Sequence, residues 1–225
     1  VIREIADSTT QEVDKAISRA LTAFTPWSEL TPGERSKKIL DYADLLEKHA
    51  DEICELEVSE TGKPWSTMRD GEFPFGLDNL RFFAGAARSL DGTGAGSFNH
   101  GYTSLLVRKP VGVIGSISPW NFPFIMAIWK IGPALAAGNT VVIKPAPQTP
   151  SSTIKLIELA KQIFAPGTIE VILGDAEVAQ QLVKDPRISM VSITGSSDSG
   201  RKVMQAASET TKRVHLELGG KAPVI

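Results

Sequence analysis

Residues 113–144 read VIGSISPWNFPFIMAIWKIGPALAAGNTVVIK, and this stretch decides the fold. The apolar run 113–118 and the β-branched run 140–144 are typical of buried strands. The apolar segment 122–137 between them has the length of a helix, and Gly138 follows it where a helix would end. A strand, a helix and a second strand in this order form the unit from which parallel sheets are built.

The same alternation continues toward the end of the chain. Further strands are predicted at 169–173, 188–194 and 214–218, and further helices at 149–164, 175–184 and 196–208. Five strands separated by four helices indicate an α/β fold with a five-stranded parallel, Rossmann-like sheet and helices on both faces. In such sheets ligands bind beyond the carboxyl ends of the strands, so the residues that follow each strand are candidates for function.

The sequence before residue 103 is typical of helices. Four are predicted: from Thr9 or Thr10 to 24, from a capping box at Thr31 to 48, from a cap at Asp51 to 61, and over 70–90. The glycine-rich segment 91–101 is predicted to be a loop. The strand after it, 103–108, is predicted to be joined to the strand 113–118, and residues 224–225 look like the start of another strand.

Composition places the chain in the ordinary soluble globular class and limits its partners. It has 225 residues with 24 basic and 26 acidic side chains, a formal net charge of −2. A protein that binds mainly nucleic acid or an acidic membrane surface would carry a basic excess, so neither is expected as a partner. The single cysteine, Cys54, excludes a disulfide within these residues and any multi-cysteine metal site; we expect no metal and a reducing, cytoplasmic setting.

One long apolar stretch, 110–143, carries Lys130 as its only charge. Pro119, Pro123 and Pro133 interrupt it, and no unbroken apolar run reaches the roughly 18–20 residues of a membrane-spanning helix. A buried strand, a turn, a helix and a second strand explain the stretch better, so no membrane span is expected.

Two strand ends in this region carry polar side chains. Asn121, in the turn after 113–118, could donate its amide to a developing oxyanion or could cap the following helix. Lys144, at the end of the next strand, could reach sugar hydroxyls or a phosphate, or could be a solvated surface lysine. These residues alone leave both alternatives open.

Two further strand ends are candidates. The turn TGSSDSG, residues 194–200, lies between a strand and a helix, where free backbone N–H groups can bind an anion. Its spacing matches neither the usual dinucleotide fingerprint nor a P-loop, so a plain tight turn is an equal alternative. Glu217 ends the last apolar strand, and we expect its carboxylate to be partly buried, which would suit general-base chemistry. A buried carboxylate paired with a lysine is the alternative.

Together these segments resemble the aldehyde dehydrogenase family. The matching motifs occur in the family's order and extend over essentially the whole chain: Pro119-Trp120-Asn121-Phe122-Pro123, Pro133-Ala134-Leu135-Ala136-Ala137-Gly138-Asn139, Val142-Ile143-Lys144-Pro145, Gln148-Thr149-Pro150, Thr194-Gly195-Ser196 and Glu217-Leu218-Gly219-Gly220-Lys221. The resemblance favours the functional interpretation of these strand ends. It implies an N-terminal helical part of an NAD(P)-binding domain at 1–102, a strand pair at 103–118 toward a strand-built oligomerisation arm, the NAD(P)-binding core at 119–218, and the start of a catalytic domain at 219–225.

The resemblance also implies roles for single residues. Asn121 matches the oxyanion-hole asparagine, and Glu217 matches the glutamate that activates the deacylating water. Lys144 matches the lysine that contacts the cofactor ribose. The implied cofactor-binding positions are Ser118, Pro119, Trp120, Lys144, Gly195, Ser196 and Leu218. Pro147 stands where many members have a glutamate that accepts the ribose hydroxyls, so NAD is expected and NADP is left open.

The implied reaction is the NAD(P)-dependent oxidation of an aldehyde to a carboxylate through a cysteine thioester. In the family the nucleophilic cysteine follows the motif that begins at Glu217, so it is expected beyond residue 225. Cys54 lies on an amphipathic helix and is expected to be a buried structural thiol.

The resemblance implies a small aldehyde as substrate and a homodimer or homotetramer for the full-length form. Members that act on aminobutyraldehyde or betaine aldehyde look most similar. Two alternatives are kept: a truncated nucleotide-binding or interaction fragment without catalysis, and a reductase of the same fold acting on acyl phosphates or acyl-CoA.

Overall fold

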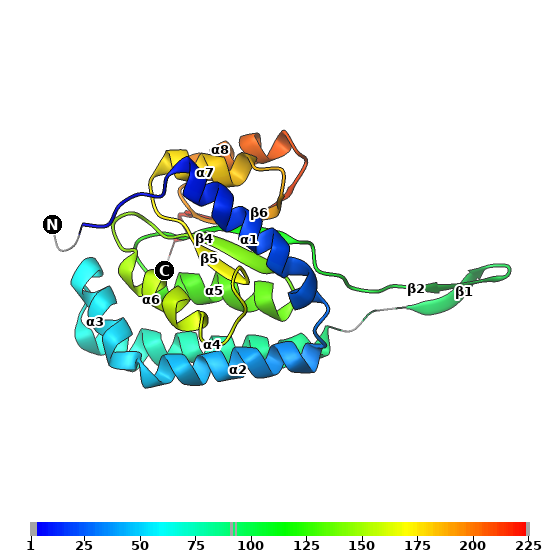
Figure 1. Cartoon of the computed structure of the whole chain (residues 1–225), viewed down its shortest axis with the longest axis horizontal. Helices are drawn as coiled ribbons and strands as arrows, with labels where there is room; N and C mark the ends of the chain where they lie inside the picture. The colour runs from blue at the N-terminus through cyan, green and yellow to red at the C-terminus, as the bar shows by residue number, and fades with distance from the viewer. Residues whose placement is uncertain (1–3, 91, 93, 224–225) are drawn as a thin grey trace.

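The computed structural model describes residues 4–90, 92 and 94–223. Its centre is a five-stranded parallel sheet in the order β5-β4-β3-β6-β7 (Figure 1). The strands are β3 (Val113–Ile117), β4 (Thr140–Lys144), β5 (Ile169–Val171), β6 (Ile188–Gly195) and β7 (Arg213–Leu218). The predicted α/β sheet is thereby confirmed.

Helices lie on both faces of the sheet, also as predicted. They are α1 (Thr10–Ser28), α2 (Pro32–Lys48), α3 (Ala50–Thr61), α4 (Phe73–Ala86), α5 (Pro123–Ala136), α6 (Ser151–Ala160), α7 (Ala176–Lys184) and α8 (Ser197–Ser208). A π-helical turn, η1 (Thr67–Glu72), precedes α4, and a 3-10 turn, η2 (Ala87–Ser89), follows it. Helices α1, α7 and α8 cover one face, α5 and α6 cover the other, and α2, α3 and α4 pack outside α5 and α6 (Figure 1).

Side chains alternate along the strands between two hydrophobic cores. Val113 and Ile117 of β3 belong to the core beneath α1, α7 and α8, whereas Ile114 belongs to the core on the α5 side. In β4, Val142 faces the first core and Ile143 the second. Every position of β3 and β4 is buried, which is why these strands appear in the sequence as continuous apolar runs.

Strands are present within 103–108 and 113–118 as predicted, but the two do not pair with each other. Strand β2 (Tyr102–Leu105) pairs antiparallel with β1 (Ala95–Asn99), which lies in the segment predicted to be a loop, and the two form a hairpin that projects from the body (Figure 1). Strand β3 pairs with β4 and β6 instead, because a fully buried strand needs backbone partners on both edges. Gly101, with a φ of +81°, allows the turn between β1 and β2. Residues 113–117 therefore belong to the central sheet.

The N-terminal helices agree with the prediction except in detail. Thr9 and Thr31 both form capping boxes at the starts of α1 and α2. Asp51 does not cap α3, which begins one residue earlier without a side-chain cap. The helix predicted over 70–90 is divided into η1, α4 and η2, and Pro74, which has no N–H to donate, stands at the change from π- to α-helix.

Within the described ranges, no helix combines the length and apolar character needed to cross a membrane. Residues 219–223 form neither helix nor strand. The strand predicted at 224–225 lies outside the described residues.

Candidate active site

The strand order creates a crevice at the carboxyl edge of the sheet. From β3 the chain proceeds to β4 and β5 on one side, and it later crosses to β6 and β7 on the other. The connections that follow β3 and β6 therefore diverge, which is where open parallel sheets bind ligands. The register aligns the strand ends, with Ile117 beside Lys144 and Ile193, and Gly195 beside Leu218. The residues predicted to be functional thus meet at one edge.

The turn between β3 and α5, residues 118–122, begins with a fixed backbone. The Ser118 N–H donates to the Lys144 carbonyl at 3.0 Å. The Ser118 side chain is buried, and its Oγ has no hydrogen-bond partner among the described residues. Trp120 is 59% exposed, and its carbonyl accepts from the Thr149 hydroxyl at 3.1 Å. Two hydrogen bonds thus anchor the backbone of this turn, while the Trp120 indole stays exposed.

Asn121 follows in the same turn and is exposed, while Pro119 is partly buried. Phe122 occupies the N-cap position of α5, and no N-cap side chain forms a hydrogen bond with this end of the helix. The capping interpretation of Asn121 is therefore wrong. Its amide lies at the carboxyl edge of the sheet, where it can donate to a ligand.

Lys144 is buried and not solvated, which removes the surface-lysine alternative. It is 4% exposed, and its Nζ donates to the carbonyls of Gly174 at 2.6 Å and of Pro145 at 3.0 Å. Burial lowers the pKa of Lys144, and the carboxylate of Asp175 acts in the opposite direction. The ammonium is thus held at the end of β4 by two neutral acceptors.

The turn between β6 and α8 combines a cap with an exposed helix start. Ser196 is the N-cap of α8, and its hydroxyl accepts from the Ser199 N–H at 3.1 Å. Other first-turn N–H groups have no partner within the helix, and the helix dipole adds partial positive charge, which together favour an anion. A Cβ built on Gly200 would lie 2.6 Å from Leu218 Cδ1, so α8 packs directly on the end of β7.

Glu217 is exposed, which contradicts the expected partial burial. Strand β7 forms an edge of the sheet, so its side chains have a neighbouring strand on one side only. The alternative of a buried carboxylate paired with a lysine is also wrong, since Glu217 forms no ion pair within the part of the chain that the structure describes.

A buried lysine that the site prediction did not include lies in the field of Glu217. Lys130 of α5 donates to Ser192 Oγ at 3.0 Å, and that oxygen lies 3.1 Å from His215 Nδ1. Burial lowers the pKa of Lys130 to about 8, and the Glu217 carboxylate opposes this shift. Its signal in the sequence was its position as the only charge in the stretch 110–143.

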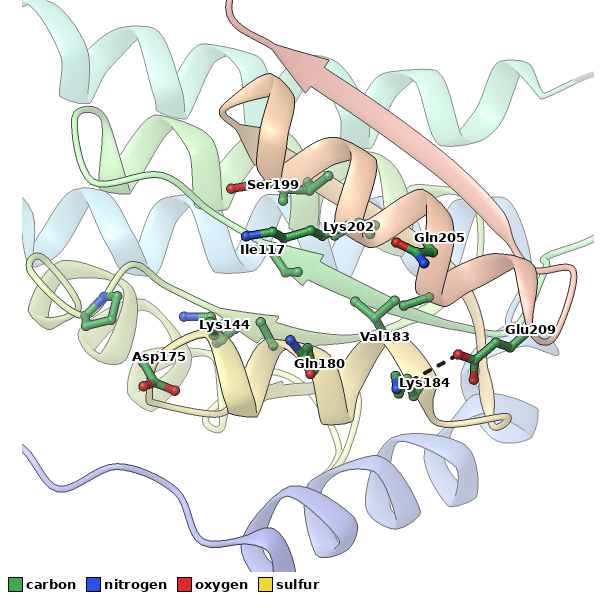
Figure 2. Close-up of a pocket in the computed structure, with 16 residues that line it drawn as sticks. Ile117, Lys144, Asp175, Gln180, Val183, Lys184, Ser199, Lys202, Gln205 and Glu209 are labelled. Carbon is green, nitrogen blue, oxygen red and sulfur yellow. Dashed lines mark ion pairs between the residues drawn. The ribbon is translucent and has the colours of Figure 1, made fainter.

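Between α7 and α8 the crevice deepens into a cavity of about 560 Å³ (Figure 2). Apolar side chains from the sheet and both helices line it, among them Ile117, Ala179, Val183, Ile193 and Val203. Lys144, Asp175, Gln180 and Lys202 add polar groups (Figure 2). The sequence predicted Asp175 only as the cap of α7, which it is, and gave no signal for Gln180 or Lys202.

Comparison with known proteins identifies the family. The family model described as "Aldehyde dehydrogenase family" matches residues 1–225. The chain belongs to the aldehyde dehydrogenase family. Fluoroacetaldehyde dehydrogenase of Streptantibioticus cattleyicolor is 42% identical over 221 residues, which cover 98% of this chain and 43% of that protein. Betaine aldehyde dehydrogenase of Vibrio vulnificus is 40% identical over 228 residues, which cover 100% of this chain and 46% of that protein.

Solved structures of this aldehyde dehydrogenase fold agree closely with the chain. PnpE in complex with nicotinamide adenine dinucleotide superposes with a TM-score of 0.94 at 38% identity, covering 98% of this chain and 45% of that chain. PnpE comes from Pseudomonas sp. WBC-3. The chain spans about half the length of the curated relatives it matches.

Proposed function

We propose that residues 1–225 form the NAD-binding part of an enzyme that oxidises an aldehyde to a carboxylate through a cysteine thioester. The observation that carries the proposal is the α7–α8 cavity, which lies at the carboxyl edge of the sheet with Lys144 on its wall. The family membership and the NAD complex of the similar protein PnpE support it.

The residues at this edge fit a dinucleotide. The apolar cavity suits a flat base, the Lys144 ammonium suits ribose hydroxyls, and the start of α8 at Gly195-Ser196 suits a pyrophosphate. The buried Ser118 hydroxyl lacks a partner in the described chain, which fits an edge that a ligand completes. When bound, NAD supplies the hydride acceptor of the oxidation.

Two residues at this edge have proposed catalytic roles. Asn121 donates its amide to the oxyanion that forms when a thiolate attacks the aldehyde, a role that typically contributes about 2.7–4 kcal/mol to the stability of the transition state. Glu217 accepts a proton from the water that hydrolyses the thioester. Its exposure on β7 leaves its carboxylate accessible to such a water.

The nucleophilic thiolate is proposed to come from outside residues 1–225. Cys54 has no exposed surface and packs among the core residues of α3. Burial raises the pKa of its thiol to about 12, so the thiolate is not formed near neutral pH.

The preference for NAD rests on the NAD complex of the similar protein PnpE, because the residue expected at the ribose does not distinguish NAD from NADP. Pro147 lines the cavity and is exposed, so it presents neither an acceptor for the ribose hydroxyls nor a charge that repels a 2′-phosphate. We propose NAD as the main cofactor, and titration with both cofactors decides whether NADP also binds. An aminoaldehyde or betaine-aldehyde-like compound is the proposed substrate class, and the similarity to the betaine aldehyde dehydrogenase of Vibrio vulnificus supports it.

The test is calorimetric titration with NAD and NADP, followed by an assay of aldehyde-dependent NADH formation, on the protein that contains this chain. A hydrogen bond from a charged group contributes about 1.5–3 kcal/mol, so we expect Lys144→Met to weaken NAD binding about 10- to 100-fold. Lys161→Met, at an exposed position after α6, serves as the control and leaves binding unchanged. Binding without aldehyde oxidation would favour the nucleotide-binding fragment, and absence of binding would refute the proposal.

A further inference from the structure

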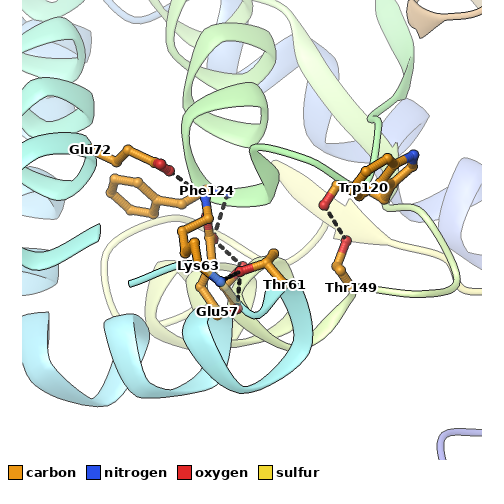
Figure 3. Close-up of polar contacts among 8 residues, drawn as sticks. Glu57, Thr61, Lys63, Glu72, Trp120, Phe124 and Thr149 are labelled. Atoms are coloured by element: carbon orange, nitrogen blue, oxygen red, sulfur yellow. Dashed lines mark hydrogen bonds and ion pairs between the residues drawn. The ribbon is translucent and has the colours of Figure 1, made fainter. Parts of the chain in front are cut away.

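A carboxylate of α3 lies buried at the starts of two other helices (Figure 3). Glu57 has no exposed surface, and its Oε2 accepts from the Phe124 N–H of α5 and from the Ser152 hydroxyl of α6, both at 2.8 Å. Pro123, the first residue of α5, has no N–H, so the Phe124 N–H is the first that this helix can donate. Glu57 therefore caps α5 from a position 67 residues away.

The charge of Glu57 is balanced inside the protein. Lys63 Nζ lies 3.0 Å from Glu57 Oε1 and 2.5 Å from Glu72 Oε2, and it lies 4.9 Å from the centre of the Phe122 ring. The positive ends of the α5 and α6 dipoles add to this field. Burial raises the pKa of Glu57, and the ion pair and hydrogen bonds act in the opposite direction. A buried carboxylate with this many partners holds the elements that supply them in place.

These contacts lie next to Asn121 in the chain. Only Phe122 and Pro123 separate Asn121 from the Phe124 N–H that Glu57 binds. The proline ring fixes the φ of Pro123, and the Phe122 ring lies against the Lys63 ammonium. The backbone between Asn121 and Phe124 therefore has little conformational freedom.

The other side of the turn is held separately. The Trp120 carbonyl accepts from the Thr149 hydroxyl, which belongs to the connection between β4 and α6 (Figure 3). Asn121 thus lies between two anchored points, one of which depends on Glu57.

We propose that Glu57 is a positioning residue of the active site, which holds the amino end of α5 and thereby sets where the Asn121 amide points. The inference rests on the proposed function, in which that amide donates to the oxyanion. A displacement of about 1 Å at such a group is enough to lower a reaction rate about 100-fold.

Glu60 offers a matched control on the same helix. It accepts from the Ser151 N–H at 2.9 Å and also from the Ser151 hydroxyl, so it too binds the start of another helix. That helix is α6, and Glu60 forms no hydrogen bond or ion pair with the turn at 118–122 among the described residues. A purely structural role for these carboxylates predicts that removing either one lowers Tm without a specific loss of kcat or faster exchange in the turn.

The experiment compares Glu57→Gln, Glu57→Ala and Glu60→Gln in the protein that contains this chain. Steady-state kinetics give kcat and KM, calorimetry gives the Kd of NAD, and amide hydrogen exchange reports on residues 118–126. We expect Glu57→Gln to lower kcat by up to about 100-fold, to leave the Kd of NAD nearly unchanged, and to speed exchange in the turn. Glu57→Ala has larger effects of the same kind, and Glu60→Gln changes neither kcat nor exchange at the turn.

Glu57→Gln keeps the shape of the side chain and one acceptor oxygen, so it decides the matter if Glu57→Ala does not fold. An unchanged kcat in Glu57→Gln, or an equal loss of kcat and Tm in Glu57→Gln and Glu60→Gln, overturns the inference. If the parent protein oxidises no aldehyde, the proposed function fails by itself. The exchange comparison then still decides whether Glu57 holds the turn, and unaltered exchange at 118–126 refutes it.

Discussion

Among single residues, Lys130 carries a charge that the fold shields from water. It is 7% exposed, and its Nζ donates to a serine hydroxyl, Ser192 Oγ. Two titratable groups on β7 lie near Lys130. The Glu217 carboxylate acts on it electrostatically, and His215 Nδ1 contacts the same Ser192 hydroxyl. Keeping this buried ammonium protonated therefore lowers the stability of the folded state.

We predict that Lys130 makes the folded state more stable as the pH rises from about 8 to about 10.5. In this window the unfolded chain keeps the proton of Lys130 while the folded chain has lost it, so a higher pH favours the folded state. The effect amounts to a few kcal/mol at most.

The measurement is the difference in unfolding free energy between the parent protein and Lys130→Met, from urea titrations below pH 8 and near pH 10.5. Other titrating groups are common to both proteins and cancel in this difference. The advantage of the methionine variant should shrink as the pH rises, and a difference that does not vary with pH would contradict the prediction.

The same scale shows what the sequence could indicate about the site. The strand-end pattern placed Asn121, Lys144 and Glu217 at one edge, because a parallel sheet brings all carboxyl ends together. The burial of Lys144 was not predictable, since it depends on the Gly174 carbonyl 30 residues away. Glu57 gave no signal either, because its partners arrive from two later helices.

Between elements, α4 and α5 cross closely because glycines stand at their contacts. A Cβ on Gly132 of α5 would lie 2.5 Å from Phe83 Cδ2, and one on Gly76 of α4 would lie 2.4 Å from Phe124 Cε1. Gly85, also on α4, has nothing within 4 Å. The two helices therefore offer both a crowded and an open glycine.

We predict opposite effects of alanine at these two kinds of site. Gly132→Ala should destabilise the protein by about 1–2 kcal/mol, because an overpacking cost of about 1–3 kcal/mol exceeds a helix-propensity gain of up to about 1 kcal/mol. Gly85→Ala has the helix-propensity gain without the overpacking cost, so it should stabilise the protein by up to about 1 kcal/mol. Chemical denaturation of both variants provides the measurement, and changes of the same sign would refute the close crossing.

The sequence predicted helices and strands correctly where the decisive residues lie within the element itself. The capping boxes at Thr9 and Thr31 and the apolar run of β4 lie within the segments that they define. The hairpin was missed because its pairing joins a glycine-rich segment to a short exposed strand, and neither has the apolar alternation that marks a half-buried strand.

At the scale of the whole molecule, the β1–β2 hairpin extends apolar side chains away from both cores. Phe98 is 77% exposed, Tyr102 is 72% exposed and Leu105 is 71% exposed. An isolated two-stranded hairpin is at best marginally stable in water, and exposed apolar side chains in one place mark an interaction surface. We therefore expect the hairpin to serve as the oligomerisation arm of the protein that contains this chain.

If the hairpin is the oligomerisation arm, substitutions in it should lower the mass of the assembly without changing the fold of the chain. Phe98→Ser combined with Leu105→Ser should convert a dimer or tetramer into smaller species in sedimentation velocity, because the contact surface loses two of its large apolar side chains. Leu21→Ser is the control, because Leu21 is exposed on α1 and does not belong to the hairpin. This variant should leave the mass unchanged. NAD binding should survive in the double variant, since none of the cavity residues belongs to the hairpin. An unchanged mass in the double variant would mean that assembly depends on another surface, whereas loss of NAD binding together with assembly would mean that the cavity itself depends on the oligomer.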